Sequence, residues 1–462
     1  MPAKPTHPHY DLVITGGTVA TPGGLVAVDV GVANGRIAAL GNIGSGAGEI
    51  LDARGLHVLP GAIDTQVHFR EPGHEQKEDL ATGTAAAALG GITAVFEMPN
   101  TSPSTLTAAD LDDKLGRARG RAWVDHAFFV GAAAANLEDL AALERRPGCS
   151  GIKVFMGSST GSLLVEDDPT LLRVLTGGAR RVAVHAEDEA RLRVRRPMVE
   201  GRASGDVALH PEWRDAETAL LATQRLLRLA RRAGRRVHVL HVSTGDEIPL
   251  LAANKDLATV EVTPQHLTLS APDCYERLGT LAQMNPPIRG EAHRQALWRA
   301  VADGIVDVIG SDHAPHLLAE KKNPYPASPS GMPGVQTLLP LMLDHVAAGR
   351  LSLQRLVDLT SAGPARVYGI AGKGRIAVGY DADFSIVDLA ARREIRQDWL
   401  ASKCGWSPFS GMRVTGWPMA TVVRGGVVMR EDELRGPPSG LPMRFQETLA
   451  AEDINASPGR SR

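Results

Sequence analysis

The stretch GAIDTQVHFREPG, residues 61–73, has the texture of a buried strand that ends in polar side chains. It opens on small and apolar residues, and Gln66, His68 and Arg70 follow at alternate positions. The next segment, LATGTAAAALGG at 80–91, carries apolar positions at helical spacing. We therefore predict one β-strand followed by one α-helix, with three polar side chains at the carboxyl end of the strand.

The same order of strand and helix recurs through the middle of the chain. Eight short apolar runs are each followed by a helical stretch: GAIDTQVHF (61–69), ITAVFEMPN (92–100), WVDHAFFVGA (123–132), GIKVFMG (151–157), RVAVHAED (181–188), RVHVLHVST (236–244), ATVEVTPQ (258–265) and GIVDVIGSD (304–312). Eight such units over roughly 300 residues match the size of a (β/α)8 barrel. A doubly wound sheet is the alternative, but it usually has fewer strands and a Gly-rich phosphate-binding turn, which this sequence lacks.

Two flanking segments, about 10–60 and 374–429, have the alternating pattern and the Gly-rich turns of β-structure. Their similar texture predicts one small β-sandwich built from both ends of the chain. The predicted division is a composite β-sandwich domain at 1–60 plus 370–435, a barrel at 61–369 and a C-terminal tail at 436–462.

Bulk composition narrows the function. The 462 residues are 43% hydrophobic and 22% charged, which is ordinary for a globular protein, and the formal charge of −2 argues against nucleic-acid binding driven by bulk charge. Cys149, Cys274 and Cys404 lie far apart, so neither a disulfide framework nor a cysteine metal site is expected. No apolar run approaches membrane-spanning length, and MPAKPTHPHY lacks the apolar core of a signal peptide. We expect a cytoplasmic protein.

Polar residues collect where the predicted strands end, and in a barrel these ends surround one cavity. The residues in question are His68, Lys153, His185, His241 and Asp312. With 15 histidines in the chain, a lone histidine at a strand end is more often a satisfied polar residue than a metal ligand. Five such groups around one cavity favour a site for Zn²⁺ or a similar divalent ion.

Lys153 stands between the apolar residues Ile152 and Val154 in the fourth run. Burial disfavours its ammonium form and lowers its pKa. One interpretation is a lysine paired with a buried carboxylate such as Asp312. The other is a neutral amine that reacts with carbon dioxide, giving a carbamate whose two oxygens bridge two metal ions.

Together these segments make the chain resemble the dihydroorotase branch of the amidohydrolase superfamily. The motifs that carry the resemblance are DTQVHFREPG, EMPNTSP, GIKVFMGSSTG, VAVHAED, VLHVST, MNPPIR and GSDHAPH, spread from residue 64 to residue 316. The flanking GRIAVGYDADFSIVDL and VVRGGVVM are similar to the composite β-sandwich of that superfamily. The resemblance implies an α/β fold, a (β/α)8 TIM barrel of the amidohydrolase type with a small β-sandwich domain.

The resemblance also implies a metal centre. One ion would be held by His185, His241 and Lys153 as its carbamate. The other would be held by His68, the carbamate and Asp312, with a histidine expected where Gln66 stands. The metal lowers the pKa of bound water from 15.7 to about 7, so that the water can attack a ring amide. Asp312 would act as general base and then as general acid, in the reversible hydrolysis of dihydroorotate to N-carbamoyl-aspartate.

Substrate choice falls to a different set of residues. The positions that the resemblance implies for substrate binding are Arg70, Asn100, Asn285 and His316. Arg70 can grip a carboxylate bidentately, although an isolated arginine here would suggest a surface salt bridge with Glu71 or Glu75. The segment SPSGMPGVQ, residues 328–336, is either a place where backbone approaches a ligand closely or an ordinary helix-entry loop.

Gln66 is the one departure among the implied ligands, because a neutral amide is a weaker ligand for zinc than imidazole. We expect one firm zinc site and a second that is weak or absent, which is still a workable hydrolytic arrangement. Two alternatives remain open: a related ring opener for hydantoins, allantoin or another cyclic ureide, and a non-catalytic dihydroorotase-like scaffold for aspartate carbamoyltransferase. The resemblance also implies a homodimer.

Overall fold

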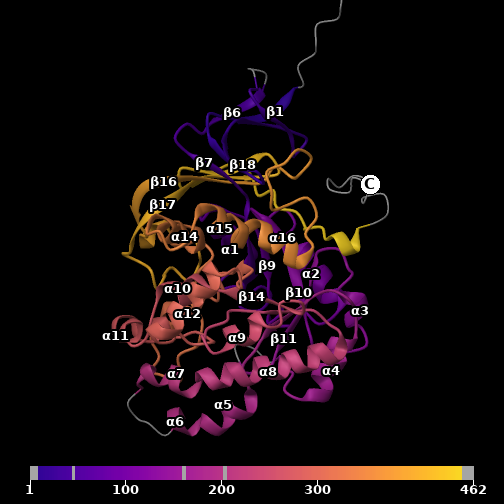
Figure 1. The fold of residues 1–462 in the computed structure, drawn as a ribbon, viewed down its shortest axis with the longest axis vertical. Coiled ribbons are helices and arrows are strands. Elements are labelled where there is room, and N and C mark those ends of the chain that lie inside the picture. Colours follow the sequence, from indigo (N-terminus) through magenta and orange to yellow (C-terminus); the bar gives the residue numbers. More distant parts are fainter. Residues whose placement is uncertain (1–8, 44–46, 159–162, 201–204, 450–462) are drawn as a thin grey trace, which may run out of the picture.

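The computed structural model describes residues 9–43, 47–158, 163–200 and 205–449, and a parallel β-barrel occupies its middle (Figure 1). Its strands, which are neighbours in chain order, are β8 (Ala62–Val67), β9 (Ile92–Glu97), β10 (Asp125–Gly131), β11 (Cys149–Phe155), β12 (Val182–His185), β13 (Val237–Val239), β14 (Ala258–Val262) and β15 (Val308–Ile309). The barrel closes where the His68 N–H donates to the His313 carbonyl at 2.7 Å. Seven of the eight predicted runs contain one strand and the run at 151–157 overlaps β11, which begins two residues earlier, so the predicted barrel is confirmed.

Helices follow the strands and cover the outside of the barrel (Figure 1). Their bounds are α1 (Leu80–Leu89), α2 (Ala108–Ala118), α3 (Leu140–Leu143), α4 (Asp168–Thr176), α5 (Glu189–Arg195), α6 (Pro197–Glu200), α7 (His210–Trp213), α8 (Ala216–Ala233), α9 (Glu247–Ala252), α10 (Pro264–Thr268), α11 (Asp273–Leu278), α12 (Glu291–Ala302), α13 (Leu318–Lys321), α14 (Leu338–Ala347), α15 (Leu353–Val357) and α16 (Gly363–Tyr368). Local chemistry sets the ends: the Asp215 side chain accepts from the Thr218 N–H to start α8, and Gly234, at φ 66°, ends it.

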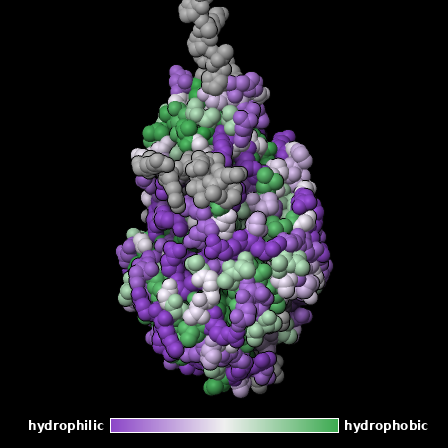
Figure 2. Space-filling view, turned by 90° about the vertical axis from the view of Figure 1, so that its right-hand side faces the viewer, coloured by the Kyte–Doolittle hydropathy of each residue, from purple (hydrophilic) through white to green (hydrophobic). Residues whose placement is uncertain are grey.

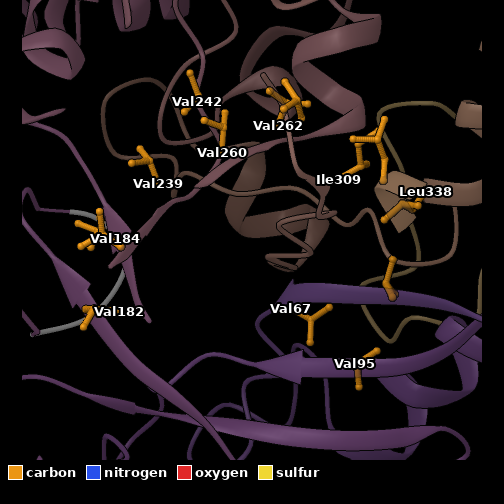
Figure 3. Packing of buried hydrophobic residues seen from close by; sticks show 14 of the residues in the cluster. Val67, Val95, Val182, Val184, Val239, Val242, Val260, Val262, Ile309 and Leu338 are labelled. Atoms are coloured by element: carbon orange, nitrogen blue, oxygen red, sulfur yellow. The ribbon is translucent and has the colours of Figure 1, made fainter. Parts of the chain in front are cut away.

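The layer between strands and helices is rich in β-branched residues. Figure 3 shows Val182 and Val184 of β12, Val239 of β13, and Val260 and Val262 of β14 in this layer, and all five are fully buried. Valine suits a parallel strand that is covered on both faces. On the face of the molecule seen in Figure 2, hydrophilic residues predominate over the barrel, with hydrophobic residues scattered among them.

Strands from both ends of the chain form two further sheets above the barrel in Figure 1. A four-stranded sheet has the order β5 (Arg36–Gly41), β4 (Asp29–Ala33), β1 (Tyr10–Thr15), β6 (Ala47–Asp52). A seven-stranded sheet has the order β19 (Glu433–Leu434), β18 (Gly426–Arg430), β17 (Arg413–Val423), β16 (Phe384–Glu394), β7 (His57–Pro60), β2 (Thr18–Thr21), β3 (Gly24–Ala27). β7 and β16 pair antiparallel, with Pro60 opposite Phe384, so the two ends of the chain share a sheet. The domain boundaries at 60, 370 and 435 stay predictions.

Residues near the C-terminus close the barrel at the amino ends of its strands. The Met443 N–H donates to the His126 carbonyl, and the Gln446 N–H donates to the Gly369 carbonyl. The Phe445 ring packs edge-on against Phe96, 5.8 Å between centroids. Of the predicted tail, residues 436–449 thus pack on the barrel, whereas 450–462 lie outside the described residues, as do the first eight. No helix in the described ranges is long and apolar enough to cross a membrane.

Candidate active site

A small pocket at the carboxyl ends of the barrel strands gathers the predicted site residues. Its lining consists of Gln66, His68, Arg70, Asn100, Lys153, Phe155, His185, His241, Asn285, Asp312, Ala314, Ser330 and Gly331. His316 lies beside this cavity, in contact with Arg70. The structure therefore places all nine predicted site residues in one region, while their roles in metal binding and catalysis remain predictions.

His185 and His241 form the first pair of candidate metal ligands. His185 Nδ1 lies 3.0 Å from His241 Nε2, and His185 Nε2 lies 2.9 Å from the Glu187 carboxylate. Burial opposes ionisation of Glu187, but Arg214 and His185 outweigh burial and hold the pKa of Glu187 well below its usual range. An ionised Glu187 beside His185 Nε2 favours the tautomer with the ring hydrogen on Nε2, which leaves the Nδ1 lone pair facing His241. This orientation suits a metal ligand.

His68 and Asp312 form the second pair. The Asn100 side-chain oxygen lies 2.7 Å from His68 Nδ1, and because an amide oxygen only accepts, Nδ1 carries the ring hydrogen. His68 Nε2 then turns its lone pair toward Asp312 Oδ1, 3.2 Å away. Burial is the largest of the effects that lower the pKa of His68, against the hydrogen bond and charge of Asp312, which raise it. With neutral His68, the lone pairs of Nε2 and of Asp312 Oδ1 face each other. A cation between the two side chains would relieve their repulsion, so the pair fits a metal ion.

Gln66 also reaches Asp312, but as a donor. Its side-chain Nε2 donates to Asp312 Oδ1 at 2.9 Å, and its Oε1 is buried without a hydrogen-bond partner among the described residues. The residue thus stands where the resemblance implies a metal ligand, yet it contributes an N–H to the carboxylate. This arrangement agrees with a weakened second metal position.

Lys153 is fully buried, and its Nζ has no hydrogen-bond partner in the described part of the chain. The alternative of a lysine hydrogen-bonded to Asp312 is therefore not what the structure shows. Burial lowers the pKa of Lys153 to about 7, against the attraction of Asp312 and Glu261. Histidine, cysteine and carboxylate side chains of the described residues alone form no metal-holding group of three or more. A carbamate on Lys153 would supply the missing oxygen ligands for both pairs.

Backbone strain marks the same site. Arg70, His241 and Asp312 have φ angles of 65°, 36° and 45°, in the left-handed region that non-glycine residues rarely occupy. Such conformations cost about 1–3 kcal/mol each and concentrate at functional sites. The Asp64 carboxylate helps to hold this backbone, because it accepts from the Ser311 N–H at 2.9 Å. The folded state thus tolerates an unfavourable backbone conformation at three residues whose side chains point into the site.

Arg70 is a buried cation with no anionic partner in the described part of the chain. Its Nε donates to the Pro315 carbonyl at 3.1 Å, and no carboxylate of the described residues forms an ion pair with it. The alternative of a surface salt bridge with Glu71 or Glu75 is wrong, since Arg70 is buried, Glu71 pairs with Arg121 at 2.7 Å and Glu75 lies 3.8 Å from Arg117. Burial lowers the pKa of Arg70 to about 10, so it remains charged at neutral pH. An anionic group of a ligand would compensate this buried charge.

The 328–336 segment approaches the cavity through its backbone. Ser330 and Gly331 both line the cavity. Gly331 has φ 134°, and a Cβ atom there would lie 2.5 Å from the Ala314 carbonyl oxygen. Glycine is required here because the segment packs closely against Ala314, and this packing is compatible with both interpretations of the loop.

Three residues of the site escaped the sequence analysis. Glu187 supports His185, and its signal was its position two residues after that histidine in VAVHAED. Glu261 on β14 accepts from the Thr65 hydroxyl at 2.8 Å, and burial raises its pKa to about 8. Lys77, in the EPGHEQKED stretch, contacts His316. Each acts on another side chain rather than facing the cavity, and strand ends alone did not reveal them.

Comparison with known proteins agrees with this geometry. The model of the amidohydrolase family matches residues 57–428. A dihydroorotase of Methanosarcina mazei is 38% identical over 419 residues, 87% of this chain and 91% of the relative. An allantoinase of Rubrobacter xylanophilus is 38% identical over 456 residues, 95% of this chain and 98% of the relative. An L-hydantoinase (dihydropyrimidinase) structure from Arthrobacter aurescens superposes with a TM-score of 0.89 at 30% identity, covering 94% of this chain and 99% of that one. The chain belongs to the amidohydrolase family.

Proposed function

We propose that this protein is a dihydroorotase, which hydrolyses the cyclic amide of (S)-dihydroorotate reversibly to N-carbamoyl-L-aspartate. The observation that carries the proposal is Arg70, a buried cation with no ion-pair partner among the described residues, in the lining of the cavity that also holds the candidate metal ligands. Dihydroorotate differs from uncharged cyclic amides by its ring carboxylate, which is the group that such an arginine would bind. The similarity to dihydroorotases supports the same substrate.

The donor set indicates where metal would bind. His185, His241 and a carbamate on Lys153 would hold one Zn²⁺ ion firmly, and His68, the same carbamate and Asp312 would offer a weaker second position. When bound, the metal supplies an activated water and polarises the scissile carbonyl. All remaining steps fall to side chains of the protein.

Asp312 would move the proton. Gln66 and His68 both meet its Oδ1, and no described residue hydrogen-bonds to its Oδ2. Oδ2 can therefore accept a proton from the attacking water and return it to the ring nitrogen that leaves. The hydrogen bond from Gln66 fixes the carboxylate plane for both transfers.

Arg70, His316, Asn100 and Asn285 would orient the substrate. Arg70 and His316 would bind the ring carboxylate, and Asn285 would bind the amide edge of the ring. His210 lies 3.1 Å from the Asn285 side-chain oxygen, so the direction of this amide is already set. The ring would thus enter the cavity in one orientation, with its cyclic amide toward the metal ligands.

A second candidate is an allantoinase, because the relative from R. xylanophilus matches nearly the whole chain. The two functions make opposite demands on Arg70: allantoin carries no carboxylate, so its ring leaves the buried guanidinium without an anion. This difference favours dihydroorotate.

The test is a substrate panel. The purified chain, supplied with Zn²⁺ and bicarbonate, would be assayed with dihydroorotate, allantoin, hydantoin and dihydrouracil. We expect kcat/KM for dihydroorotate to exceed that for each other ring by about 100-fold or more, because those rings leave Arg70 unpaired. Preference for allantoin would replace the proposal by the second candidate.

The proposal includes assembly. We propose a homodimer, to be measured by sedimentation, and association with aspartate carbamoyltransferase, to be measured by mixing the purified proteins. A chain that binds the transferase but neither metal nor substrate would be a scaffold instead of an enzyme.

A further inference from the structure

Lys77, in the segment between β8 and α1, lies against His316. Its Nζ is 3.2 Å from His316 Nδ1 and 2.9 Å from the Glu320 carboxylate. Only 14% of the Lys77 side chain is exposed, and His316 is almost fully buried. The contact is therefore a fixed feature of the interior and not a passing surface pair.

The contact determines which nitrogen of His316 carries the hydrogen. Lys77 pairs with Glu320 as an ammonium ion, and an ammonium offers only donors. His316 Nδ1 must accept from it, so the ring hydrogen resides on Nε2. An independent contact agrees: Nε2 lies 3.1 Å from the Ser330 carbonyl, which only accepts. Glu320 Oε2, at 3.9 Å from Nδ1, is too far to take a hydrogen from it.

With the hydrogen on Nε2, His316 cannot accept a hydrogen bond from the neighbouring Arg70. His316 Nε2 lies 3.3 Å from Arg70 Nη2, and both atoms are then hydrogen-bond donors that cannot satisfy each other. Two donors held side by side, with no carboxylate among the described residues paired to Arg70, form a receptor for an anionic oxygen. The opposite tautomer would turn the Nε2 lone pair toward that oxygen and repel it.

We propose that Lys77 is a positioning residue for substrate recognition: by donating to His316 Nδ1, it keeps the hydrogen on Nε2 and completes, with Arg70, a two-donor receptor for the ring carboxylate. The inference rests on the proposed function for the identity of the anion. The tautomer itself follows from contacts within the free protein and does not depend on the substrate.

A purely structural role for Lys77 is the competing explanation. In that case the ion pair between Lys77 and Glu320 would simply fasten α13 to the segment after β8. Changing either partner would then have similar effects, and neither change would discriminate between a carboxylated ring and an uncharged one.

The first experiment is ¹⁵N NMR of the histidine rings in the zinc-loaded full chain, with a His316→Gln variant to assign the signals. We expect Nδ1 of His316 to be unprotonated and Nε2 to carry the hydrogen. A hydrogen on Nδ1, or on both nitrogens, in the unmodified protein would overturn the proposal without any variant of Lys77.

The second experiment compares Lys77→Met, Lys77→Arg and the control Glu320→Gln. Lys77→Met should mix the tautomers and raise KM for dihydroorotate about tenfold, the loss expected for one charge-assisted hydrogen bond. Its kcat, and its KM for dihydrouracil, the same ring without the carboxylate, should stay within about threefold. Lys77→Arg should restore the tautomer, and Glu320→Gln should retain it.

Equal changes for both rings, or equal effects of Lys77→Met and Glu320→Gln, would show that Lys77 is only structural. A chain that does not hydrolyse dihydroorotate would refute the proposed function alone, because the NMR result on His316 would still stand. If Lys77→Met does not fold, Lys77→Leu, which also lacks a donor, takes its place with the same expectations.

Discussion

The Gln66 side-chain amide donates a hydrogen bond to Asp312 Oδ1 across 2.9 Å, and His68 Nε2 meets the same oxygen at 3.2 Å. A histidine at position 66 would offer a lone pair to a metal, whereas the amide nitrogen offers only hydrogens. Under the proposed function, the contact replaces a metal ligand at position 66 by a hydrogen bond that supports Asp312. We therefore expect one firmly bound metal ion, and an Asp312 carboxylate that is held in place to act as the general base.

Gln66→His should restore the second metal position. We expect zinc content, measured by elemental analysis after removal of free metal, to rise from about one to about two ions per chain. Gln66→Asn, whose shorter amide reaches neither Asp312 nor a metal, is the matched control and should stay at about one. Two ions in the unmodified protein would show that Gln66 does not weaken the second position.

Lys153 should carry a carbamate that forms as pH rises. Only the neutral amine reacts with carbon dioxide, and with a pKa of about 7 the neutral fraction is small at pH 6 and large at pH 8. Carbamate signal in ¹³C NMR, after exposure to labelled bicarbonate, should increase over that range and vanish in Lys153→Ala.

Lys321 supplies an internal control for this experiment. Burial also lowers its pKa to about 7, but its Nζ donates to the Gln283 and Pro329 carbonyls, so it is not free to react. We expect one carbamate signal. A second signal that is lost in Lys321→Ala would mean that burial alone, and not the free Nζ of Lys153, selects the modified lysine.

Arg70→Met should abolish the preference for a carboxylated ring. Loss of two charge-assisted hydrogen bonds is expected to lower kcat/KM for dihydroorotate by about 100-fold or more, with dihydrouracil changed much less. Arg117→Met, at a half-buried arginine outside the cavity, should change either value by no more than about twofold. An equal loss for both rings would indicate that Arg70 supports the fold and not the substrate.

Glu187→Gln should weaken metal binding although Glu187 is not itself a candidate metal ligand. The change removes the carboxylate 2.9 Å from His185 Nε2, which fixes the tautomer of that ring. Zinc affinity, measured by competition with a chelator, should fall about 10- to 100-fold. Glu166→Gln, at an exposed glutamate paired with Arg193, serves as the control and should leave affinity unchanged. Unaltered affinity in Glu187→Gln would mean that His185 does not bind the metal.

Much of the fold was readable from the sequence because each strand of the barrel leaves a local pattern. The Val-rich runs that become β12, β13 and β14 are short, continuous and bounded by helical stretches, as buried parallel strands must be. The residues at their ends, such as His185 and His241, could be placed together because parallel strands end on one side of a barrel.

Pairwise contacts were not readable in the same way. Nothing local to Gln66 announces that its amide points at Asp312, 246 positions away. The hydrogen positions on His316 depend on Lys77 and Ser330, which converge only after folding. Glu261 was overlooked because a carboxylate in a strand resembles a solvent-facing residue until the barrel closes around it.

The most direct test measures zinc content and dihydroorotate hydrolysis on the same preparation of the unmodified protein, supplied with Zn²⁺ and bicarbonate and followed by ultraviolet absorbance. We expect about one zinc ion per chain and turnover that Lys153→Ala abolishes. Bound zinc without turnover of dihydroorotate would contradict the proposed substrate. Neither zinc nor turnover would mean that Gln66 has replaced the chemistry of this site instead of adapting it.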